Sequence, residues 1–517
     1  MNARPLLLCA AACLLAGSCA APTRRPSPST TQTGDFAAAI ARIKRTDAAS
    51  PALLNAQLAY GEFLLSRAKG PCAQRLVLAQ EQLGSVDASL KTRVMFPDGW
   101  ARSADLEYRL HLVRAGCGSK TDRRDDLLAA AAAARRAVKL YRNSFDYESM
   151  VIMQFDVGVT LHRLGDNTAA LAALQAALDM DREYGFEDDA RQNYQLLLTW
   201  RGQPAGPPQV AALMRDFPKR QATLRFAWHA ADAQVTLEQR RTFLEDDRVV
   251  HSRASATFER RTAAQAGGGW SVSYTHRLTR YDPGVWPSEA DPKRKTPLVL
   301  PPALLFTADF KVSAGGELQS IADANGFAAR LSAQVGKLIR AGAPSRDPRH
   351  EALNEALDRA SGALAPGLLE AGTAENYQLE TAMWSGAKLE QGVWYALSAP
   401  LSVPGMPQFV VQHRIEFAFT RRVPCTAGAA TQRCVEIVLH ATPDRKSLND
   451  VLADISDPDE PFVDYDTSTD ARIVVDPATL LPYAREEQVY WFASLGNGEG
   501  HAVLESDHLV STIRYDH

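Results

Sequence analysis

The cysteines are the residues whose type and spacing point most directly to chemistry. Three of the seven lie within the first nineteen residues, and the other four are Cys72, Cys117, Cys425 and Cys434. Cys425 and Cys434 flank a short polar loop between two strand-like runs, which predicts a disulfide that closes a hairpin. Cys72 and Cys117 form the remaining pair, with helical sequence between them. Zinc binding is the alternative, but no neighbouring CxxC or histidine pair would complete a site, so we expect disulfides.

Two short motifs have catalytic spacing but lack an essential part. Residues 350–354 (HEALN) differ from the zinc-protease sequence HExxH at Asn354, which replaces the second metal-binding histidine. Residues 385–388 (SGAK) match SxxK, in which the serine opens a helix and the lysine lies one turn on. Gly386 disfavours a helix there, and neither an S-D-N nor a following K-T-G sequence occurs. We expect neither segment to be an active site.

The remaining polar clusters favour structural explanations. The densest group of carboxylates, between Asp450 and Asp470, could bind Ca²⁺, but it lacks the glycine and glutamate positions of an EF-hand and is predicted to be a solvated loop. His501 and His508 fall on opposite faces of a predicted strand and cannot share a metal. The glycines of 496–500 precede a strand, which indicates a turn. No catalytic residue, metal site or cofactor is predicted, and a hydrolase assembled from distant residues is the least supported hypothesis.

The N-terminus indicates where the chain is delivered. Arg4 is followed by an apolar run of about ten residues, too short for a bilayer-spanning helix, which needs roughly 20. Residues 1–18 are therefore expected to be an export signal. Residues 16–19 (AGSC) resemble the lipobox of bacterial lipoproteins, in which the cysteine is acylated after cleavage, although alanine and serine replace the commonest residues at two positions. The alternative is ordinary cleavage after residue 20 or 21, which would remove Cys19.

The lipobox resemblance implies that Cys19 anchors the protein in the bacterial cell envelope, facing the periplasm. Two or more acyl chains hold a protein stably because each buried CH₂ contributes roughly 0.8 kcal/mol. Ala20 follows the cysteine, and in that family the absence of aspartate there favours the outer membrane. Residues 19–35 hold the cysteine and a proline-rich segment poor in apolar residues, which is expected to be a flexible tether. An oxidising periplasm would also permit the disulfides.

Length and composition limit the rest of the chain. At 517 residues it is too long for one core, and 23% charged and 46% hydrophobic residues are an ordinary globular balance. The net charge of −3 and the lack of a Lys/Arg run give no reason to expect a nucleic-acid partner. The predicted parts are a helical domain over 36–203, a linker over 204–220 and a β-rich domain over 221–517 with a helical insertion around 325–383.

The helical domain has apolar residues at the 3.6-residue period, with breaks at glycine and proline. One helix pair resembles a tetratricopeptide repeat, although Gln154 replaces the usual tryptophan and Arg182 stands where the closing proline is expected. Certain positions of the repeat require small side chains because its two helices approach each other closely there. The resemblance implies a stack of degenerate repeats that binds a protein or peptide, and a helical bundle without a groove is the alternative. The matching positions are Gly158, Leu161, Ala170, Leu174 and Ala177.

After the linker the apolar period changes from 3.6 to 2. Over 408–420 apolar residues alternate with polar ones, which indicates an antiparallel sheet with one buried face. His413 falls in the apolar row and is expected to be a core histidine. The fold class is therefore α+β, with a large antiparallel sheet or half-barrel that carries helices against one face. Other predicted strands cover about 222–231, 234–245, 248–261, 270–281, 304–312, 392–399, 434–441, 470–476, 482–494 and 501–515.

The order of strands and turns, including the segments 310–318 and 475–482, is similar to bacterial envelope lipoproteins with curved sheets, of the lipoprotein-carrier kind. In some of those families the concave face holds a lipid or acyl chain. The first functional hypothesis is a non-enzymatic envelope scaffold whose helical repeats dock a partner. The second is a carrier or sensor that binds a lipid or other apolar ligand on the sheet.

Overall fold

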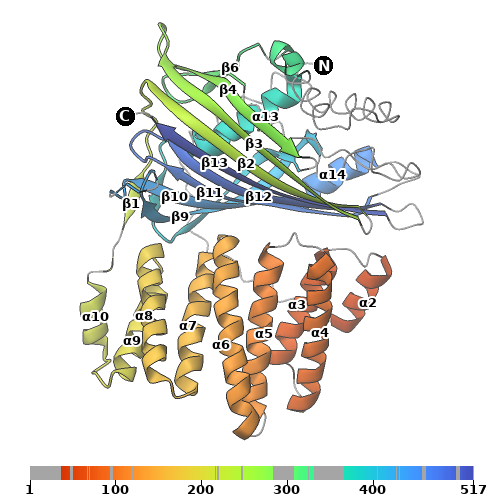
Figure 1. Cartoon of the computed structure of the whole chain (residues 1–517), viewed down its shortest axis with the longest axis vertical. Helices are drawn as coiled ribbons and strands as arrows, with labels where there is room; N and C mark the ends of the chain where they lie inside the picture. The colour runs from red at the N-terminus through yellow and green to blue at the C-terminus, as the bar shows by residue number, and fades with distance from the viewer. Residues whose placement is uncertain are drawn as a thin grey trace.

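The structure, a computed structural model, describes residues 36–46, 51–66, 68, 70–92, 97–117, 120–215, 217, 220–245, 248–282, 308–323, 325–330, 333, 366–404, 406–426, 428–429, 431–456, 462–495 and 501–515. Helices make up the N-terminal part, and an antiparallel sheet of 11 strands with inserted helices follows. Figure 1 shows the two parts one above the other. The predicted α+β class is confirmed.

The helices of the first part stand side by side below the sheet (Figure 1), and each packs mainly against its neighbour in sequence. Aspartates begin two of them, because the Asp146 and Asp166 carboxylates accept the backbone N–H groups of Ser149 at 3.0 Å and Ala169 at 3.1 Å. The helices are α2 (Phe36–Thr46), α3 (Pro51–Ser66), α4 (Cys72–Thr92), α5 (Pro97–Cys117), α6 (Lys120–Asn143), α7 (Tyr147–Arg163), α8 (Asn167–Tyr184), α9 (Glu187–Trp200) and α10 (Pro207–Met214).

The contact between α7 and α8 explains the small residues of the repeat-like pair. A Cβ at Gly158 would lie 3.2 Å from the backbone nitrogen of Leu174 and 3.3 Å from the carbonyl oxygen of Ala170. Leu161 is buried, and Ala170, Leu174 and Ala177 are fully so. A side chain at residue 158 would therefore push the two helices apart.

A disulfide joins Cys72 and Cys117, whose Cα atoms are 6.3 Å apart. Cys72 is the first residue of α4 and Cys117 the last of α5. The bridge therefore joins the two helices at the end of the antiparallel pair that lies away from their connecting segment. The predicted pairing is confirmed.

The sheet has the strand order β6-β5-β4-β3-β2-β13-β12-β11-β10-β9-β8, so its first long strand lies beside its last. A separate two-stranded sheet pairs β1 (Gln221–Thr223) with β7 (Lys388–Glu390). The strands of the large sheet are β2 (Ala231–Glu245), β3 (Arg248–Ala264), β4 (Trp270–Asp282), β5 (Phe310–Val312), β6 (Leu318–Ile321), β8 (Trp394–Val403), β9 (Met406–Val423), β10 (Cys434–Pro443), β11 (Phe462–Val475), β12 (Pro482–Leu495) and β13 (His501–Tyr515).

The strand predicted over 222–231 is wrong in extent. Only Gln221–Thr223 forms a strand, and residues 224–230 belong to no helix or strand. The N–H groups of Arg225 and Ala227 donate to the carbonyl oxygens of Pro477 and Thr479. This stretch therefore packs on a turn, because its backbone donors find turn carbonyls instead of a neighbouring strand.

The acidic segment predicted as a solvated loop is mostly regular structure. Its first part belongs to helix α14 (Arg445–Ile455), and its last part to β11. Residues 457–460 lie outside the described residues. The register of β11 against β12 runs to Phe462, so pairing with a neighbouring strand overrides the loop preference of the polar sequence.

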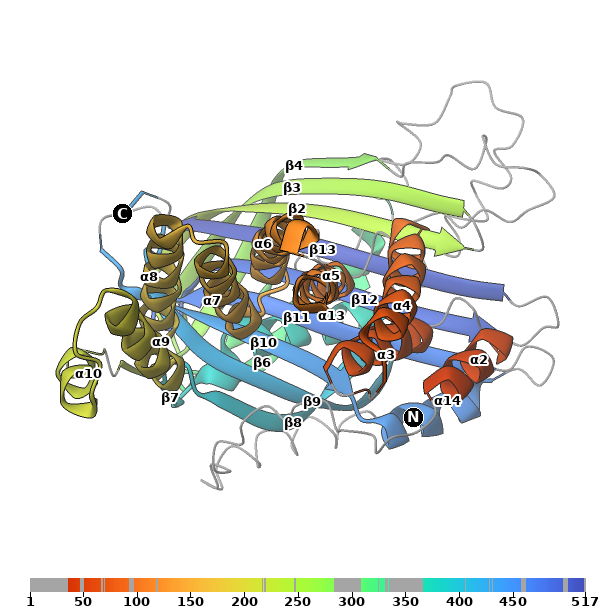
Figure 2. The same ribbon diagram turned by 90° about the horizontal axis from the view of Figure 1, so that it is seen from below.

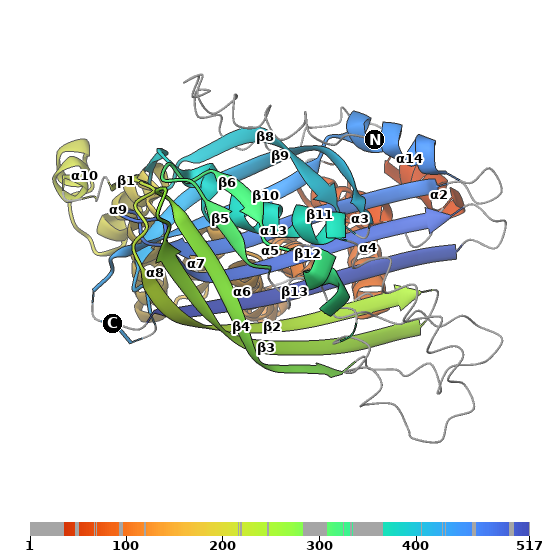
Figure 3. The ribbon, with the colours of Figure 1, turned by 90° about the horizontal axis from the view of Figure 1, so that it is seen from above.

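Both faces of the sheet are covered, whereas helices were predicted on one face. Helix α13 (Pro366–Glu380), from the predicted insertion, lies over the face seen from above (Figure 3). The helices of the first part meet the opposite face with their ends (Figure 2). Ala418 and Val438 of the sheet share a core cluster with α5 to α8, and Phe492 shares one with α3 to α5. The face of strand 408–420 that was predicted to contact water is therefore partly covered by helices.

Candidate functional site

A pocket lies between α13 and the sheet, and we call it the α13 pocket. Its empty volume, which includes space open to solvent, is about 610 Å³. Its lining is mostly apolar with a few polar groups that converge from both layers. The lining residues are Val235, Leu237, Phe258, Arg260, Tyr274, Phe310, Thr373, Asn376, Tyr377, Glu380, Thr381, Arg485, Leu509, Ser511 and Ile513.

Strand alternation directs these side chains into the pocket. On β2, Val235 and Leu237 are buried, while Thr236 between them is exposed on the other face. On β3, Arg260 follows Phe258 in the same inward row, and Arg261 points outward. The pocket floor is thus assembled from strands at the two ends of the β-rich region, because β2 pairs with β13.

Arg485 joins the floor of the pocket to its roof. Its guanidinium donates to the Asn376 Oδ1 at 2.8 Å and to the Glu487 carboxylate, and it lies 3.5 Å from the Glu380 carboxylate. Arg485 is 4% exposed. A buried guanidinium is stable when carboxylates balance its charge. Two carboxylates therefore neutralise this arginine and fix α13 on the sheet.

Arg260 is a buried guanidinium of a different kind. It is 3% exposed, its Nη1 donates to the Tyr515 hydroxyl at 3.2 Å, and its charged group lies 5.3 Å from the ring centre of Trp228. Its Nε, like that of Arg485, has no hydrogen-bond partner. Among the described residues no carboxylate forms an ion pair with it. The fork of this arginine is therefore only partly used by the protein.

Neighbouring groups keep Arg260 charged. Burial alone would lower the pKa of Arg260, but Tyr515, Tyr274 and Glu380 outweigh burial, so its pKa lies above the ordinary value. Burial raises the pKa of Tyr274 to about 12, against the opposing effect of Arg260. The phenols around the pocket thus stay protonated at neutral pH, and Arg260 carries a full positive charge.

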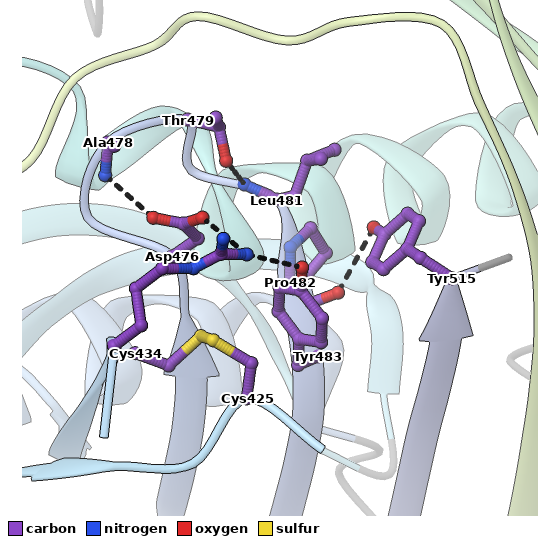
Figure 4. Close-up of a disulfide and its surroundings, with 10 residues drawn as sticks. Cys425, Cys434, Asp476, Ala478, Thr479, Leu481, Pro482, Tyr483 and Tyr515 are labelled. Atoms are coloured by element: carbon purple, nitrogen blue, oxygen red, sulfur yellow. Dashed lines mark hydrogen bonds and ion pairs between the residues drawn. A yellow bond between two sulfur atoms is a disulfide. The ribbon is translucent and has the colours of Figure 1, made fainter. Parts of the chain in front are cut away.

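A disulfide joins Cys425 and Cys434, and the residues around it include Tyr515 (Figure 4). Arg433, beside the bridge, pairs with the Asp476 carboxylate at 3.1 Å and donates to the Tyr483 hydroxyl at 3.3 Å. The Tyr515 hydroxyl that accepts from Arg260 donates in turn to the Pro482 carbonyl at 3.1 Å. The Cα atoms of the cysteines are 5.0 Å apart, and the predicted hairpin bridge is confirmed.

An aromatic wall closes one side of the pocket. Tyr377 of α13 contacts Trp228 edge-on and packs against Phe310, with ring centres 5.8 and 5.4 Å apart. The Tyr377 hydroxyl donates to the Gly316 carbonyl oxygen at 2.8 Å. Burial raises the pKa of this phenol. On this side the roof helix is therefore held by apolar contacts and one buried hydrogen bond, in addition to its contacts with Arg485.

The residues singled out in the sequence lie elsewhere. The repeat positions pack α7 on α8, and the cysteines form bridges outside the pocket lining. His413 is a core histidine as predicted, buried with its Nδ1 3.1 Å from the Val411 carbonyl oxygen. Ser385 follows a short 3₁₀ helix and Lys388 lies in β7, so SxxK forms no helical pair.

Some predicted features cannot be placed, because Cys19, the tether, 350–354 and 496–500 lie outside the described residues. Among the residues that are described, no group of three or more His, Cys, Asp or Glu side chains could hold a metal ion. Within the same ranges no helix is long and apolar enough to cross a membrane.

Arg260 and Arg485 were not among the residues predicted from the sequence to form a site. A signal for Arg260 exists in β3, where Ala254, Ala256 and Phe258 form an apolar row at the two-residue period and Arg260 continues that row. Its neighbour Arg261 is the outward residue. The row could have identified a buried charge, but the partners of that charge lie on other strands.

Comparisons with known proteins give little. No protein-family model matches the chain. No curated protein matches it either. A solved structure titled "Lipid-protein interactions in lipovitellin" aligns with 55% of this chain at 8% identity and a TM-score of 0.28. The chain spans 25% of the length of that lipovitellin chain. A TM-score this low does not indicate a shared fold.

Proposed function

We propose that this protein is a non-enzymatic carrier or sensor that binds a small, partly apolar molecule in the α13 pocket. One observation carries the proposal: a pocket with mostly apolar walls between two layers contains a buried arginine that the protein itself only partly satisfies. Apolar walls with a few convergent polar groups are the usual composition of ligand sites. Among the described residues no hydroxyl group of the lining donates a hydrogen bond to a carboxylate of the lining, so binding is the activity that the lining favours.

A docking function of the helices has less support. The large apolar side chains that the described helices expose are isolated aliphatic ones, such as Val77, Leu128 and Ile152, while Tyr108 and Tyr141 are buried. Interaction sites are typically contiguous and rich in aromatic residues. The ends of several helices are also occupied by the sheet. We therefore infer that the helical part chiefly supports the sheet.

We further propose that the protein acts at the bacterial cell envelope, held by acyl chains on Cys19 and facing the periplasm, with the outer membrane favoured. The lipobox-like residues 16–19 support this location. The Cys19→Ser variant of the full chain should move from the membrane fraction to the soluble fraction. Unchanged recovery with membranes would contradict the anchor.

The binding proposal is tested by filling the pocket. Ser511 lines it, and the next residue on β13, Thr512, is exposed on the other face. Ser511→Phe should remove a co-purifying small molecule that native mass spectrometry and solvent extraction detect in the wild-type full chain. Thr512→Phe, the matched control, should retain it. Wild-type protein that carries no molecule, or a Ser511→Phe variant that keeps it, would contradict the proposal.

A further inference from the structure

We propose that the α13 pocket binds a small carboxylate with an apolar body, and that the Arg260 guanidinium holds its carboxylate group. The inference rests on the proposed function and adds the chemical class of the ligand. It depends on three observations: the unused donors of Arg260, the charge balance of the pocket, and the apolar lining.

The unused donors come first. An arginine presents five N–H groups, and removing them from water is costly unless acceptors replace the water. Arg260 has one hydrogen bond, to Tyr515, and a face contact with Trp228, and its Nε is buried without a partner. Because Arg260 also lines the pocket, a ligand oxygen there can accept the hydrogen bonds that the protein leaves unmade.

Charge balance selects the class of acceptor. Of the two arginines in the lining, Arg485 is paired with Glu487 and Glu380. Glu380 influences Arg260 only at longer range, since its ion pair is with Arg485. The two glutamates therefore balance the two arginines in number, but both lie against Arg485, and among the described residues no carboxylate forms an ion pair with Arg260. A carboxylate supplies one charge and two oxygens that match the guanidinium fork, whereas a phosphate dianion would bring a second charge close to two glutamates.

The apolar walls select the rest of the ligand. Val235, Leu237, Phe258, Leu509 and Ile513 form most of the floor around Arg260. These side chains offer no hydrogen-bonding groups, so they favour an alkyl or aromatic body. The expected ligand is thus an amphipathic acid with its head on β3 and its body along β2 and β13.

The test compares three probes of equal chain length on the full-length protein by isothermal titration calorimetry. Octanoate should bind more tightly than octan-1-ol and octyl phosphate. Arg260→Met should weaken octanoate binding roughly 30-fold or more, as for loss of one partner of a buried charge pair. Arg261→Met is the matched control, because Arg261 is exposed on the opposite face of the same strand, and its affinity should equal that of wild type.

The outcomes separate this inference from the function on which it rests. Octan-1-ol binding as tightly as octanoate, or an unchanged affinity in Arg260→Met, would overturn the role of Arg260 and leave a binding pocket. Tighter binding of octyl phosphate would overturn the carboxylate class. Absence of binding by all three probes, with no molecule co-purifying, would overturn both proposals. The probe comparison on wild-type protein does not depend on how the variant folds, and Arg260→Lys, which keeps the charge, should recover part of the affinity.

Discussion

The half-buried arginines Arg421 and Arg472, on the face that meets the helical part, are ion-paired, whereas the α13 face holds one paired arginine, Arg485, and one buried arginine without an ion pair, Arg260. On the face that meets the helical part, Arg421 and Arg472 both pair with Glu436, each at 3.1 Å. Arg421 also pairs with Glu183 of α8 and lies over the Tyr184 ring. On the α13 face, Arg260 has no comparable ion pair among the described residues. The paired arginines join the layers, and we infer that Arg260, which has no ion pair, serves a ligand.

We call the face of the sheet that meets the helical part the joining face, and its ion pairs form a network around Glu436. Glu436 is fully buried, and the Thr420 hydroxyl donates to its carboxylate at 2.9 Å. Arg472 continues the network to Glu486 at 3.1 Å. Nearby, Gly185 ends α8 with a φ of +85° and lies close enough to Gln391 that a Cβ would be 2.9 Å from its backbone. Every charge in this network has an opposite charge beside it, which is what a purely structural site requires.

The largest expected effect tests the joining face. Glu436→Ala would leave Arg421 and Arg472 side by side without their shared carboxylate. We expect the free energy of unfolding to fall by about 3 kcal/mol, the lower end for breaking a buried pair, because both arginines keep other partners. Urea denaturation measures the change. Glu238→Ala, at an exposed position on β2, is the control. A loss no larger than that of the control would contradict a structural role for the ion pairs of Glu436.

A smaller effect is expected for the unpaired arginine. Arg260→Met removes a buried charge whose protein contacts are one hydrogen bond and one ring. The methionine keeps apolar volume against Trp228, so the free energy of unfolding should stay within about 1 kcal/mol of wild type in ligand-free protein. The same urea series provides the measurement. A loss as large as that for Glu436→Ala would show that Arg260 is structural, contrary to the role assigned to it.

The smallest effect concerns pH, and the two faces should respond with opposite sign. Burial raises the pKa of Glu375 on α13 to about 7 from an ordinary 4.5. The folded state then holds this proton more tightly than the unfolded chain, so its contribution to stability falls as pH rises from about 4.5 to about 7. The hydrogen bond from His508 lowers the pKa of Glu486 on the joining face, so its contribution is present at higher pH and is lost as pH falls through the folded-state pKa.

The variants Glu375→Gln and Glu486→Gln separate these contributions. Urea midpoints at about pH 5 and about pH 7.5 should show that Glu375→Gln removes a decrease in stability across this range. Glu486→Gln should instead lessen the loss of stability below about pH 4.5, which further urea midpoints in that acid range would measure. Parallel pH profiles for wild type and Glu375→Gln would indicate that this carboxyl group has an ordinary pKa.

Local patterns predicted more of the fold than of the site. The 3.6-residue and two-residue periods identified most helices and strands, and the polar loop between Cys425 and Cys434 identified the hairpin bridge. The strand over 222–231 and the acidic loop were mistaken because tertiary contacts, a turn in one case and a neighbouring strand in the other, determined those backbones. The second covered face also escaped prediction, since Ala418 is buried in a cluster formed with residues of distant helices.

The sequence by itself determined the α+β fold class, the two disulfide pairs and the division into helical and β-rich parts, because these follow from residue spacing along short segments. Only the tertiary structure decided which charges are neutralised. Arg260 and Arg485 belong to strands far apart in the sequence, and the pairing of β2 with β13 brings both under α13. Whether a buried guanidinium has a carboxylate beside it depends on distances across strands, which local spacing does not specify.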